Sequence, residues 1–527
     1  MKALNRLQLY PLVKVAAVLI LGIILGDLIG HVLPLSVMLG LTILSLIVSL
    51  GSGKWPQVQS FMILFTVLFV GMFCLAVKKE KMDIHLPVSV QSTEAVVVSA
   101  PLSKGKILQC DLYVLSGSLC GKKVKASFLR DTIENHYQSI QLGSGIRIQS
   151  FFTPVTSFYP HSHFDYCRWM KIYGYDAQTF VNAHNWQTMR FDTKLLPRIE
   201  RLKLAAQRVR ANLLEQYDLL GLADQDYAIV SAMTLGDKSL LSNETKKVYS
   251  ISGASHVLAL SGLHLSIIFG LLAFVFGGKG SKGMMHLVAI LLAIWIYVFL
   301  TGMSSSVMRS AIMLTFYTFI SMLHREKTSL NALALTAIVM LLWNPLSLWD
   351  ISFQMSFMAV FAILLLYQFI AQWIPQHWLS RSSVIGKMWG TIAVSLAAQA
   401  GTAPLVAYYF GRFSSYFLVT NLIAIPLTIV ILYVSATMFA LSIFPLIQRW
   451  VAWGLSWLSQ LLNDSLAVIA SWPGASVENI HLNLVQVILI YGMIGMVLGL
   501  IYFIQKGYRQ SLNYSTRGRD ACTNRQV

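Results

Sequence analysis

Charged side chains are scarce in this chain, and their scarcity excludes an ordinary soluble protein. Only 12% of its 527 residues are Asp, Glu, Lys or Arg, whereas 56% are hydrophobic and the mean hydropathy is +0.63. Soluble domains carry about twice that share of charge. The apolar residues come in blocks long enough to cross hydrocarbon, so the sequence predicts a polytopic α-helical membrane protein. The net charge of +18 argues only weakly for nucleic acid, because Lys and Arg gather in the cytoplasmic loops of such proteins.

Signatures of several kinds of site are missing. The five cysteines form no CxxC pair, which gives a structural zinc site little support. No Walker A run, GxSxG elbow or HExxH motif is present. We therefore expect no cofactor, no metal site, no catalytic residues and no enzyme activity.

Long apolar runs predict the membrane helices. The first run lacks a small-residue cleavage site and two more follow it, which indicates a first transmembrane helix and not a removed signal peptide. Twelve spans are expected, near residues 9–30, 35–50, 58–77, 255–276, 285–302, 304–323, 329–343, 352–370, 388–410, 415–440, 448–470 and 484–505.

A polar segment separates the third span from the fourth. Its candidate strands are 94–99, 107–115, 122–129, 145–152 and 176–182. Five short strands favour a small OB-like β-barrel, with a sandwich fragment as the alternative. We divide the chain into N-terminal helices (1–82), this β domain (83–191), a helical linker (192–252), a membrane domain (253–505) and a basic tail (506–527).

The linker contains a basic amphipathic helix. Its apolar residues recur at helical spacing, with Arg and Lys between them: Ile199, Leu202, Val209, Leu213 and Leu220. Such a helix lies on a membrane surface or packs on the β domain with its charged face in water.

The loops that carry Lys and Arg predict the orientation. They alternate with loops nearly free of these residues, Arg412 being the exception. By the positive-inside rule both termini lie in the cytoplasm and the β domain lies outside the inner membrane. Disulfides persist in that compartment. Cys110 and Cys120 lie close enough in sequence to form one, and the alternative is two ordinary buried thiols.

The fourth span opens with polar residues that a lipid-facing anchor would lack. They are His256, Ser261, Gly262 and His264. Polar groups at membrane depth face a bundle interior or a watery path. The two histidines would lie about 80° apart on a helix. This is poor geometry for a shared metal, so we favour pore-lining or interhelical hydrogen bonds. Gly262 would allow close backbone approach or a helix break.

Further polar residues lie in later spans. Arg309 needs an anion or a carboxylate, and Asp350 is the expected partner. Gln354, Gln399 and Asn421 add uncharged polar groups, and Pro404 and Pro426 are expected to interrupt their helices. Interrupted helices with inward amides are typical of a transport path, although polar residues also hold helices together.

One apparent metal motif is rejected. His161-Ser-His163-Phe-Asp165 resembles the HxHxD run of metallo-hydrolases, but Tyr166 follows where that family has a histidine. No later cluster of His, Asp or Cys supplies the remaining ligands.

Several of these stretches together resemble the ComEC competence family. The resemblance is carried by residues 164–174, 235–239, 253–264, 306–311, 344–357 and 421–426, and the run from His256 to His264 is its most specific part. It implies an inner-membrane channel that passes single-stranded DNA into the cytoplasm during natural transformation.

The resemblance also implies partners. Many members continue into a metallo-β-lactamase-like domain, which is not expected in this chain because it stops about twenty residues after its last predicted span. A separate nuclease would supply that activity, beside a DNA receptor, a cytoplasmic helicase and the lipid bilayer. A homo-oligomer is a further possibility.

The β domain offers candidate DNA contacts. They are Lys104, Lys106, Lys122, Lys123, Lys125 and Arg147, interspersed with aromatic residues that could stack on bases. The alternative is a domain that braces the channel and binds nothing. Two further functions stay open: a secondary transporter for a small anionic solute, with Arg309 as counter-ion, and a membrane-embedded enzyme acting on lipid, with His256 or His264 as base.

Overall fold

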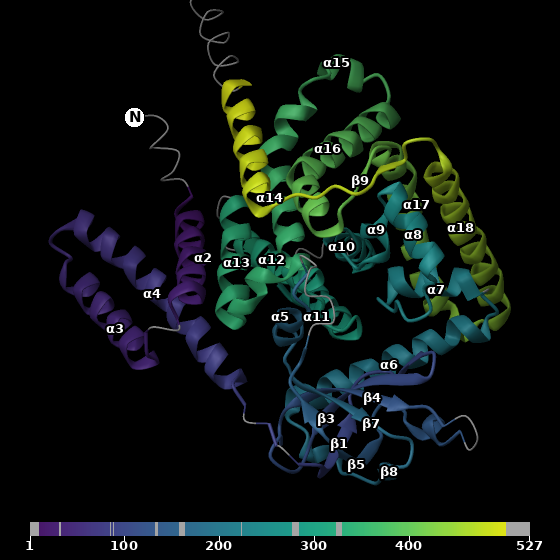
Figure 1. The fold of residues 1–527 in the computed structure, drawn as a ribbon. Coiled ribbons are helices and arrows are strands. Elements are labelled where there is room, and N and C mark those ends of the chain that lie inside the picture. The colour runs from purple at the N-terminus through teal and green to yellow at the C-terminus, as the bar shows by residue number, and fades with distance from the viewer. Residues whose placement is uncertain are drawn as a thin grey trace, which may run out of the picture.

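The computed structural model describes residues 10–30, 33–84, 86–87, 89–131, 135–156, 164–222, 224–276, 284–322 and 329–501. The β domain lies at one end of a helical bundle, and the N-terminal helices lie to one side of it (Figure 1). The segment 161–163 of the rejected metal motif, the expected tail 506–527 and the loop residues Lys279, Lys282, Arg325 and Lys327 lie outside the described residues.

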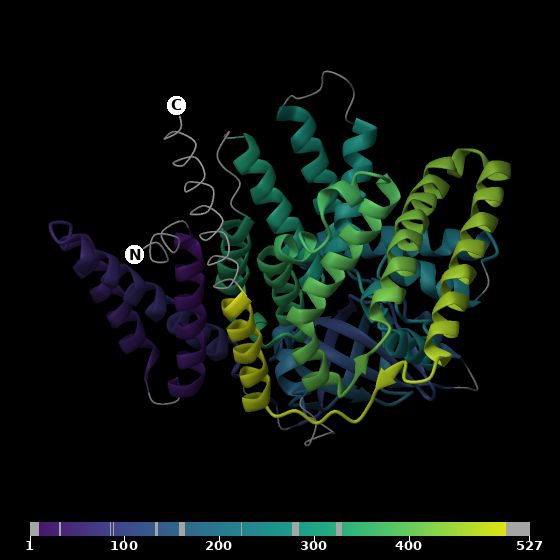
Figure 2. The same ribbon diagram turned by 90° about the horizontal axis from the view of Figure 1, so that it is seen from above.

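Helices account for most of the described chain. The N-terminal group is α2 (Pro11–Ile29), α3 (Leu35–Gly51) and α4 (Pro56–Met82). The bundle holds α7 (Asp224–Thr234), α8 (Asn243–Ser252), α9 (Ser255–Leu258), α10 (Gly262–Phe276), α11 (Met284–Leu300), α12 (Ser305–Met322), α13 (Ser329–Trp343), α14 (Ile351–Ala371), α15 (Gln376–Leu379), α16 (Ser383–Phe410), α17 (Phe417–Ala440) and α18 (Pro445–Ser471). A final apolar helix covers Leu484–Ile501 and lies beside α14 (Figure 2).

The described helices bear on the expected number of spans. One overlaps each of the twelve expected spans, but only six of the described helices are long and apolar enough to cross a membrane. The others include α10 and α13 with 15 residues each, fewer than the roughly 20 that a straight span needs. Six helices are therefore candidate membrane spans, and the count of twelve is not confirmed.

The β domain is a mixed sheet. Its strands are β1 (Gln91–Val97), β2 (Leu102–Lys104), β3 (Ile107–Val114), β4 (Lys123–Leu129), β5 (Gly145–Ser150), β6 (Phe152–Thr153), β7 (Tyr175–Val181) and β8 (Trp186–Met189). The order is β6-β7-β4-β3-β1-β5-β8, with β2 on β3, and only β4 and β7 pair in parallel. All five expected strands are present, β2, β6 and β8 are additional, and a closed OB-like barrel is not confirmed.

Cys110 and Cys120 lie in different surroundings, the first on β3 and the second after it. Its inward residues Leu108, Cys110, Leu112 and Val114 are buried in the sheet core. Cys120 lies beyond the strand on an exposed turn, where its thiol donates to the carbonyl of Leu115 at 3.0 Å. Both cysteines are free thiols in this structure, so the possible disulfide is not formed, and of the two thiols only Cys110 is buried.

Helix α6 (Arg198–Leu219) joins the domain to the bundle. Leu204 packs with Val96 of β1, and the helix runs between the sheet and the bundle (Figure 1). Packing on the β domain, the second of the two arrangements expected for this helix, is therefore present. Ile199, Leu202 and Val209 stay exposed along it.

The short helix α5 (Tyr166–Ile172) anchors the β domain to the N-terminal helices. Asp27 of α2 accepts from Arg168 of α5 at 2.5 Å and pairs with Lys79 of α4 at 2.8 Å. The Arg168 guanidinium also lies 4.2 Å from the centre of the Trp349 ring. One carboxylate therefore joins three segments, and we name this group the Asp27 clamp.

We predict that Asp27→Asn loosens α5. The substitution leaves two cations without their anion, and we expect α5 to lose roughly 1–2 kcal/mol of local stability. Hydrogen exchange of the 166–173 amides would accelerate in the full-length protein. Glu478→Gln, which removes the more exposed pair with Arg412, is the control and should change little. Equal exchange in Asp27→Asn and wild type would contradict a role for the clamp.

Candidate functional site

The expected fourth span is broken close to its beginning. Helix α9 stops at Leu258, Ala259 is extended, and α10 begins at Gly262. Backbone groups at such a break lack helical partners, so they must bind side chains, other backbone groups or water. The break that Gly262 was expected to allow is therefore present.

His264 and Ser261 stabilise the beginning of α10. Nδ1 of His264 lies 2.9 Å from the Ser261 hydroxyl and accepts from the Ser261 N–H at 3.4 Å. This is half of a capping box, with histidine in the place usually taken by Glu or Gln. A backbone N–H can only donate, so Nδ1 accepts and the ring proton is on Nε2. That Nε2 is buried and has no hydrogen-bond partner among the described residues.

Gly236 packs directly on Leu260, the middle residue of the break between α9 and Gly262. Gly236 has φ +76°, and a Cβ there would lie 2.5 Å from Cδ1 of Leu260. The neighbouring Asp237 lies 3.9 Å from Arg210 of α6. The 235–239 loop thus connects α6 to the break.

Arg309 lies against the first residue of α10. A Cβ on Gly262 would be 2.7 Å from Nη2 of Arg309 and 2.6 Å from the Ser310 hydroxyl. The Arg309 side chain is 5% exposed and donates to Ser310 at 3.0 Å. Only glycine at position 262 leaves room for this contact.

The expected pair between Arg309 and Asp350 is not formed. Asp350 caps α14 through the Ser352 N–H and accepts from the Ser305 hydroxyl at 2.5 Å. Arg309 is one helical turn beyond Ser305, and no ion pair of the described residues includes it. The Asp350 carboxylate therefore binds the neutral hydroxyl of Ser305 and not the guanidinium of Arg309.

The uncharged polar residues bind neighbouring helices. Gln354 donates to the Leu348 carbonyl and accepts from Tyr409, and Asn421 donates to Ser395 at 3.1 Å. Gln399 is half-buried, with no hydrogen bond assigned among the described residues. These contacts hold helices together, as the alternative interpretation expected.

The two prolines do not interrupt their helices. Pro404 lies inside α16 and Pro426 inside α17. Pro404 cannot donate to the carbonyl of Ala400, and the next carbonyl, that of Gly401, accepts from Tyr491 at 2.7 Å. Hydroxyl groups from neighbouring helices can satisfy backbone groups beside such prolines, so a helix in lipid continues past them.

The histidines do not form a metal site. The His256 ring is exposed, with Nδ1 3.2 Å from the Gly253 carbonyl, whereas His264 is buried. Among the described residues, no group of three or more His, Cys, Asp or Glu side chains could hold a metal ion.

Most of the expected DNA contacts are neutralised within the β domain. Arg147 pairs with Glu94 at 2.7 Å, and Lys122 lies 4.0 Å from Asp176. Lys104 and Lys106 differ, because both are exposed on the hairpin of β2 and β3 and neither has an acidic partner within the described part of the chain. Lys104 donates only to Gln109, at 3.0 Å.

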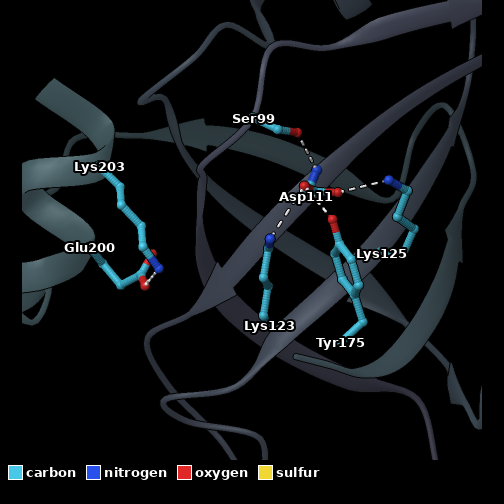
Figure 3. Close-up of polar contacts among 7 residues, drawn as sticks. All are labelled: Ser99, Asp111, Lys123, Lys125, Tyr175, Glu200 and Lys203. Atoms are coloured by element: carbon cyan, nitrogen blue, oxygen red, sulfur yellow. Dashed lines mark hydrogen bonds and ion pairs between the residues drawn. The ribbon is translucent and has the colours of Figure 1, made fainter. Parts of the chain in front are cut away.

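Lys123 and Lys125 converge on Asp111, as Figure 3 shows. Their ammonium groups lie 3.6 and 2.9 Å from its carboxylate, and the Tyr175 hydroxyl donates to it at 2.7 Å. Burial opposes ionisation of Asp111, but the two lysine charges and the hydrogen bonds outweigh it and lower the pKa of this carboxyl. Burial lowers the pKa of Lys123 despite the attraction of Asp111. We name these four residues the Asp111 cluster.

Two polar groups escaped the sequence analysis. Asp27 is a lone acid in an apolar span, a signal that predicts a nearby cation. Asp226 of α7 is 3% exposed and accepts from Gln460 of α18 at 2.9 Å and from Ser456. Its partners lie more than two hundred residues away, so local pattern could not reveal them.

Comparison with known proteins identifies the family. The family model described as "Competence protein" matches residues 233–504, slightly more than half of the chain. The chain belongs to the competence protein family. The match includes the broken helix, the 235–239 loop and Arg309.

Relatives of this competence protein are larger or distant. It is 33% identical over 198 residues to ComE operon protein 3 of Bacillus subtilis, covering 38% of this chain and 24% of that protein. It is 26% identical over 208 residues to Recombination protein 2 of Haemophilus influenzae, covering 38% and 26%. An uncharacterized protein of Aquifex aeolicus is 25% identical over 340 residues, which cover 64% of this chain and 72% of that protein. The chain thus spans about a quarter of the length of the two named relatives, and no solved structure matches.

We predict that Gly262→Ala destabilises this competence protein. The new methyl group displaces the guanidinium of Arg309, and overpacking of this kind costs roughly 1–3 kcal/mol. Thermal unfolding of the full-length protein in detergent should shift down. Gly454→Ala in α18 is the matched control, because its Cβ meets nothing within 4 Å and should slightly favour the helix. Equal shifts for both variants would contradict the close contact.

We predict a pH-dependent effect for Asp111→Asn. The lowered pKa means that the ionised carboxylate stabilises the fold above about pH 4, and this stabilisation is lost as the pH falls through the folded-state pKa. Removing one partner of a buried ion pair costs roughly 3–5 kcal/mol at pH 7. The cost should shrink at pH 3.

Hydrogen exchange of the β3 and β4 amides, corrected for intrinsic pH dependence, measures this effect. Glu94→Gln, which breaks the exposed pair with Arg147, is the control and should cost under about 1 kcal/mol. An Asp111→Asn cost that is equal at pH 7 and pH 3 would contradict the electrostatic origin.

Proposed function

We propose that this protein forms an inner-membrane channel that passes single-stranded DNA into the cytoplasm during competence. The observation that carries the proposal is the match to the competence family over the membrane region, which supports a role in DNA uptake. The relatives named ComE operon protein 3 and Recombination protein 2 support the same role.

The broken helix supports a path through the bundle. Non-helical backbone at membrane depth is tolerated where protein buries it or where it lines a watery cavity. Residues 259–261 meet this condition beside polar groups of α10 and α12. In this proposal twelve helices span the membrane, both termini are cytoplasmic, and the β domain lies outside.

The β domain would receive the strand. A single bent segment supports an OB-type barrel, because β5 pairs with β1 while β6, one residue further on, pairs with β7. Of the six basic residues expected to bind DNA, Lys104 and Lys106 are the best candidates, since the other four face acidic partners. Binding to phosphates needs cations that are free of such partners.

One rival function keeps specific support. A buried arginine that no carboxylate of the described residues pairs also suits a transporter for a small anionic solute. The lipid-enzyme alternative would use the contact of Ser261 with His264 as nucleophile and base, but the capping geometry already explains that contact.

The proposed channel works with other proteins. A DNA receptor would deliver the strand, a separate nuclease would remove its complement, and a cytoplasmic helicase would draw it inward. Lipid surrounds the apolar helices, and a homo-oligomer is compatible with their exposed faces.

We predict that deleting the gene from its host abolishes entry of labelled DNA into the cytoplasm while DNA bound to the cell surface is retained. Restoring the wild-type gene should restore entry. Unchanged entry after deletion would overturn the proposal and favour the solute transporter.

We predict that Lys104→Ala with Lys106→Ala weakens binding of a labelled oligonucleotide. Each lost phosphate contact should reduce the slope of log affinity against log salt by about 0.7. Lys194→Ala, which removes an exposed lysine outside the strands, is the control. An unchanged slope in the double variant would favour a domain that only braces the channel.

A further inference from the structure

Two positively polarised groups meet at the helix break. The guanidinium of Arg309 lies against Gly262, the first residue of α10. Its Nη2 is 2.7 Å from the point that a Cβ on residue 262 would occupy. A helix N-terminus carries a partial positive charge and N–H groups that lack helical acceptors. The first helical bond at this end runs from the Leu265 N–H to the Ser261 carbonyl, so the N–H groups of residues 262–264 precede it.

Among the residues that the structure describes, no carboxylate pairs with Arg309. Arg309 is 5% exposed, and its Nε is buried without a hydrogen-bond partner among the described residues. Its assigned contacts are the Ser310 hydroxyl and the ring of Phe357, 6.0 Å from the guanidinium carbon. A buried cation without an anion is unfavourable. Asp350, the carboxylate expected to pair with Arg309, binds the Ser305 hydroxyl.

The cap leaves the amides of α10 available. Nδ1 of His264 takes the N–H of Ser261, the residue before the helix. The N–H groups that follow are not used by this side chain, and Gly262 has no Cβ to cover them. Gly262 and Leu263 are only partly buried, so a ligand can reach this end of the helix.

We propose that Arg309 and the N-terminus of α10 form a binding site for a phosphate group. The planar guanidinium fork and the helix amides are the two devices that proteins combine to hold phosphate oxygens. This inference rests on the proposed function, in which a strand presents one phosphodiester per nucleotide at the break. A phospholipid headgroup carries the same chemistry and is the other source.

A single site of this kind suits passage. A strand must bind well enough to enter and weakly enough to leave, and one arginine with one helix end meets both conditions better than a closed cage of ligands. The ring of Phe357, 6.0 Å from the guanidinium carbon of Arg309, offers the guanidinium no hydrogen-bond acceptor that would compete with a phosphate.

The test uses the full-length protein in detergent and a fluorescent 20-nucleotide oligo-dT. Affinity is measured over a range of salt concentrations for wild type, Arg309→Gln and Arg309→Lys. We expect Arg309→Gln to reduce the salt slope by about 0.7, the value for one phosphate contact, and Arg309→Lys to retain it. Arg412→Gln, which removes a partly exposed arginine paired with Glu478, is the matched control and should keep the slope.

Two further measurements keep the test decisive. An uncharged methylphosphonate oligonucleotide should bind wild type and Arg309→Gln equally if the difference between them is a phosphate contact. Native mass spectrometry of the same samples counts phospholipids that remain bound after purification. Thermal unfolding confirms that each variant is folded.

Each outcome has one meaning. A reduced slope supports the site with the strand as its source, and an unchanged slope with loss of bound phospholipid in Arg309→Gln supports it with lipid as the source. If neither changes, the site is overturned even when wild type takes up DNA. If wild type neither binds the oligonucleotide nor supports uptake, the proposed function fails, while the phospholipid count still tests the site.

Discussion

A backbone N–H or C=O group without a hydrogen-bond partner is very unfavourable in hydrocarbon. The residues around the helix break at 259–261 must therefore bury it or bind its free backbone groups. His264 caps the new helix, Gly236 lets Leu260 pack closely, and Gly262 lets Arg309 reach the helix end. These residues come from three separate stretches of the chain. The family match extends over all three, which agrees with their acting together.

Several charged side chains of this protein pair with one another inside it and are not free at its surface. Asp27 holds two cations, and Asp111 holds two lysines and a tyrosine hydroxyl. The β domain is therefore less basic at its surface than its composition indicates. The Asp111 contacts join β3 to β4 and β7, so they hold the strands of one sheet in register.

The sequence predicted the elements well because their patterns are strong. Alternation identified the five main strands, and long apolar runs identified positions that helices occupy. It failed where the outcome depends on tertiary partners. Spacing could not tell that Ser305 is closer to Asp350 than Arg309 is. The expectation that prolines interrupt helices comes from soluble proteins. It did not allow for a hydroxyl from another helix, such as that of Tyr491, which donates to the Gly401 carbonyl beside Pro404. The Asp111 cluster was within reach, since alternation places Asp111 on the face opposite Cys110 and beside Lys125.

The use of Asp350 as a helix cap has a consequence for the part of the bundle from α9 onward. From Ser255 to Ile501 the chain contains four acidic residues, Glu326, Asp350, Asp464 and Glu478. Asp350 is held by a serine hydroxyl and Glu478 lies 3.6 Å from Arg412. A polyanion moving among these helices would meet almost no like charge. If a strand passes this way, little like charge would oppose it, and Arg309, which is buried, would be the positive charge closest to the helix break.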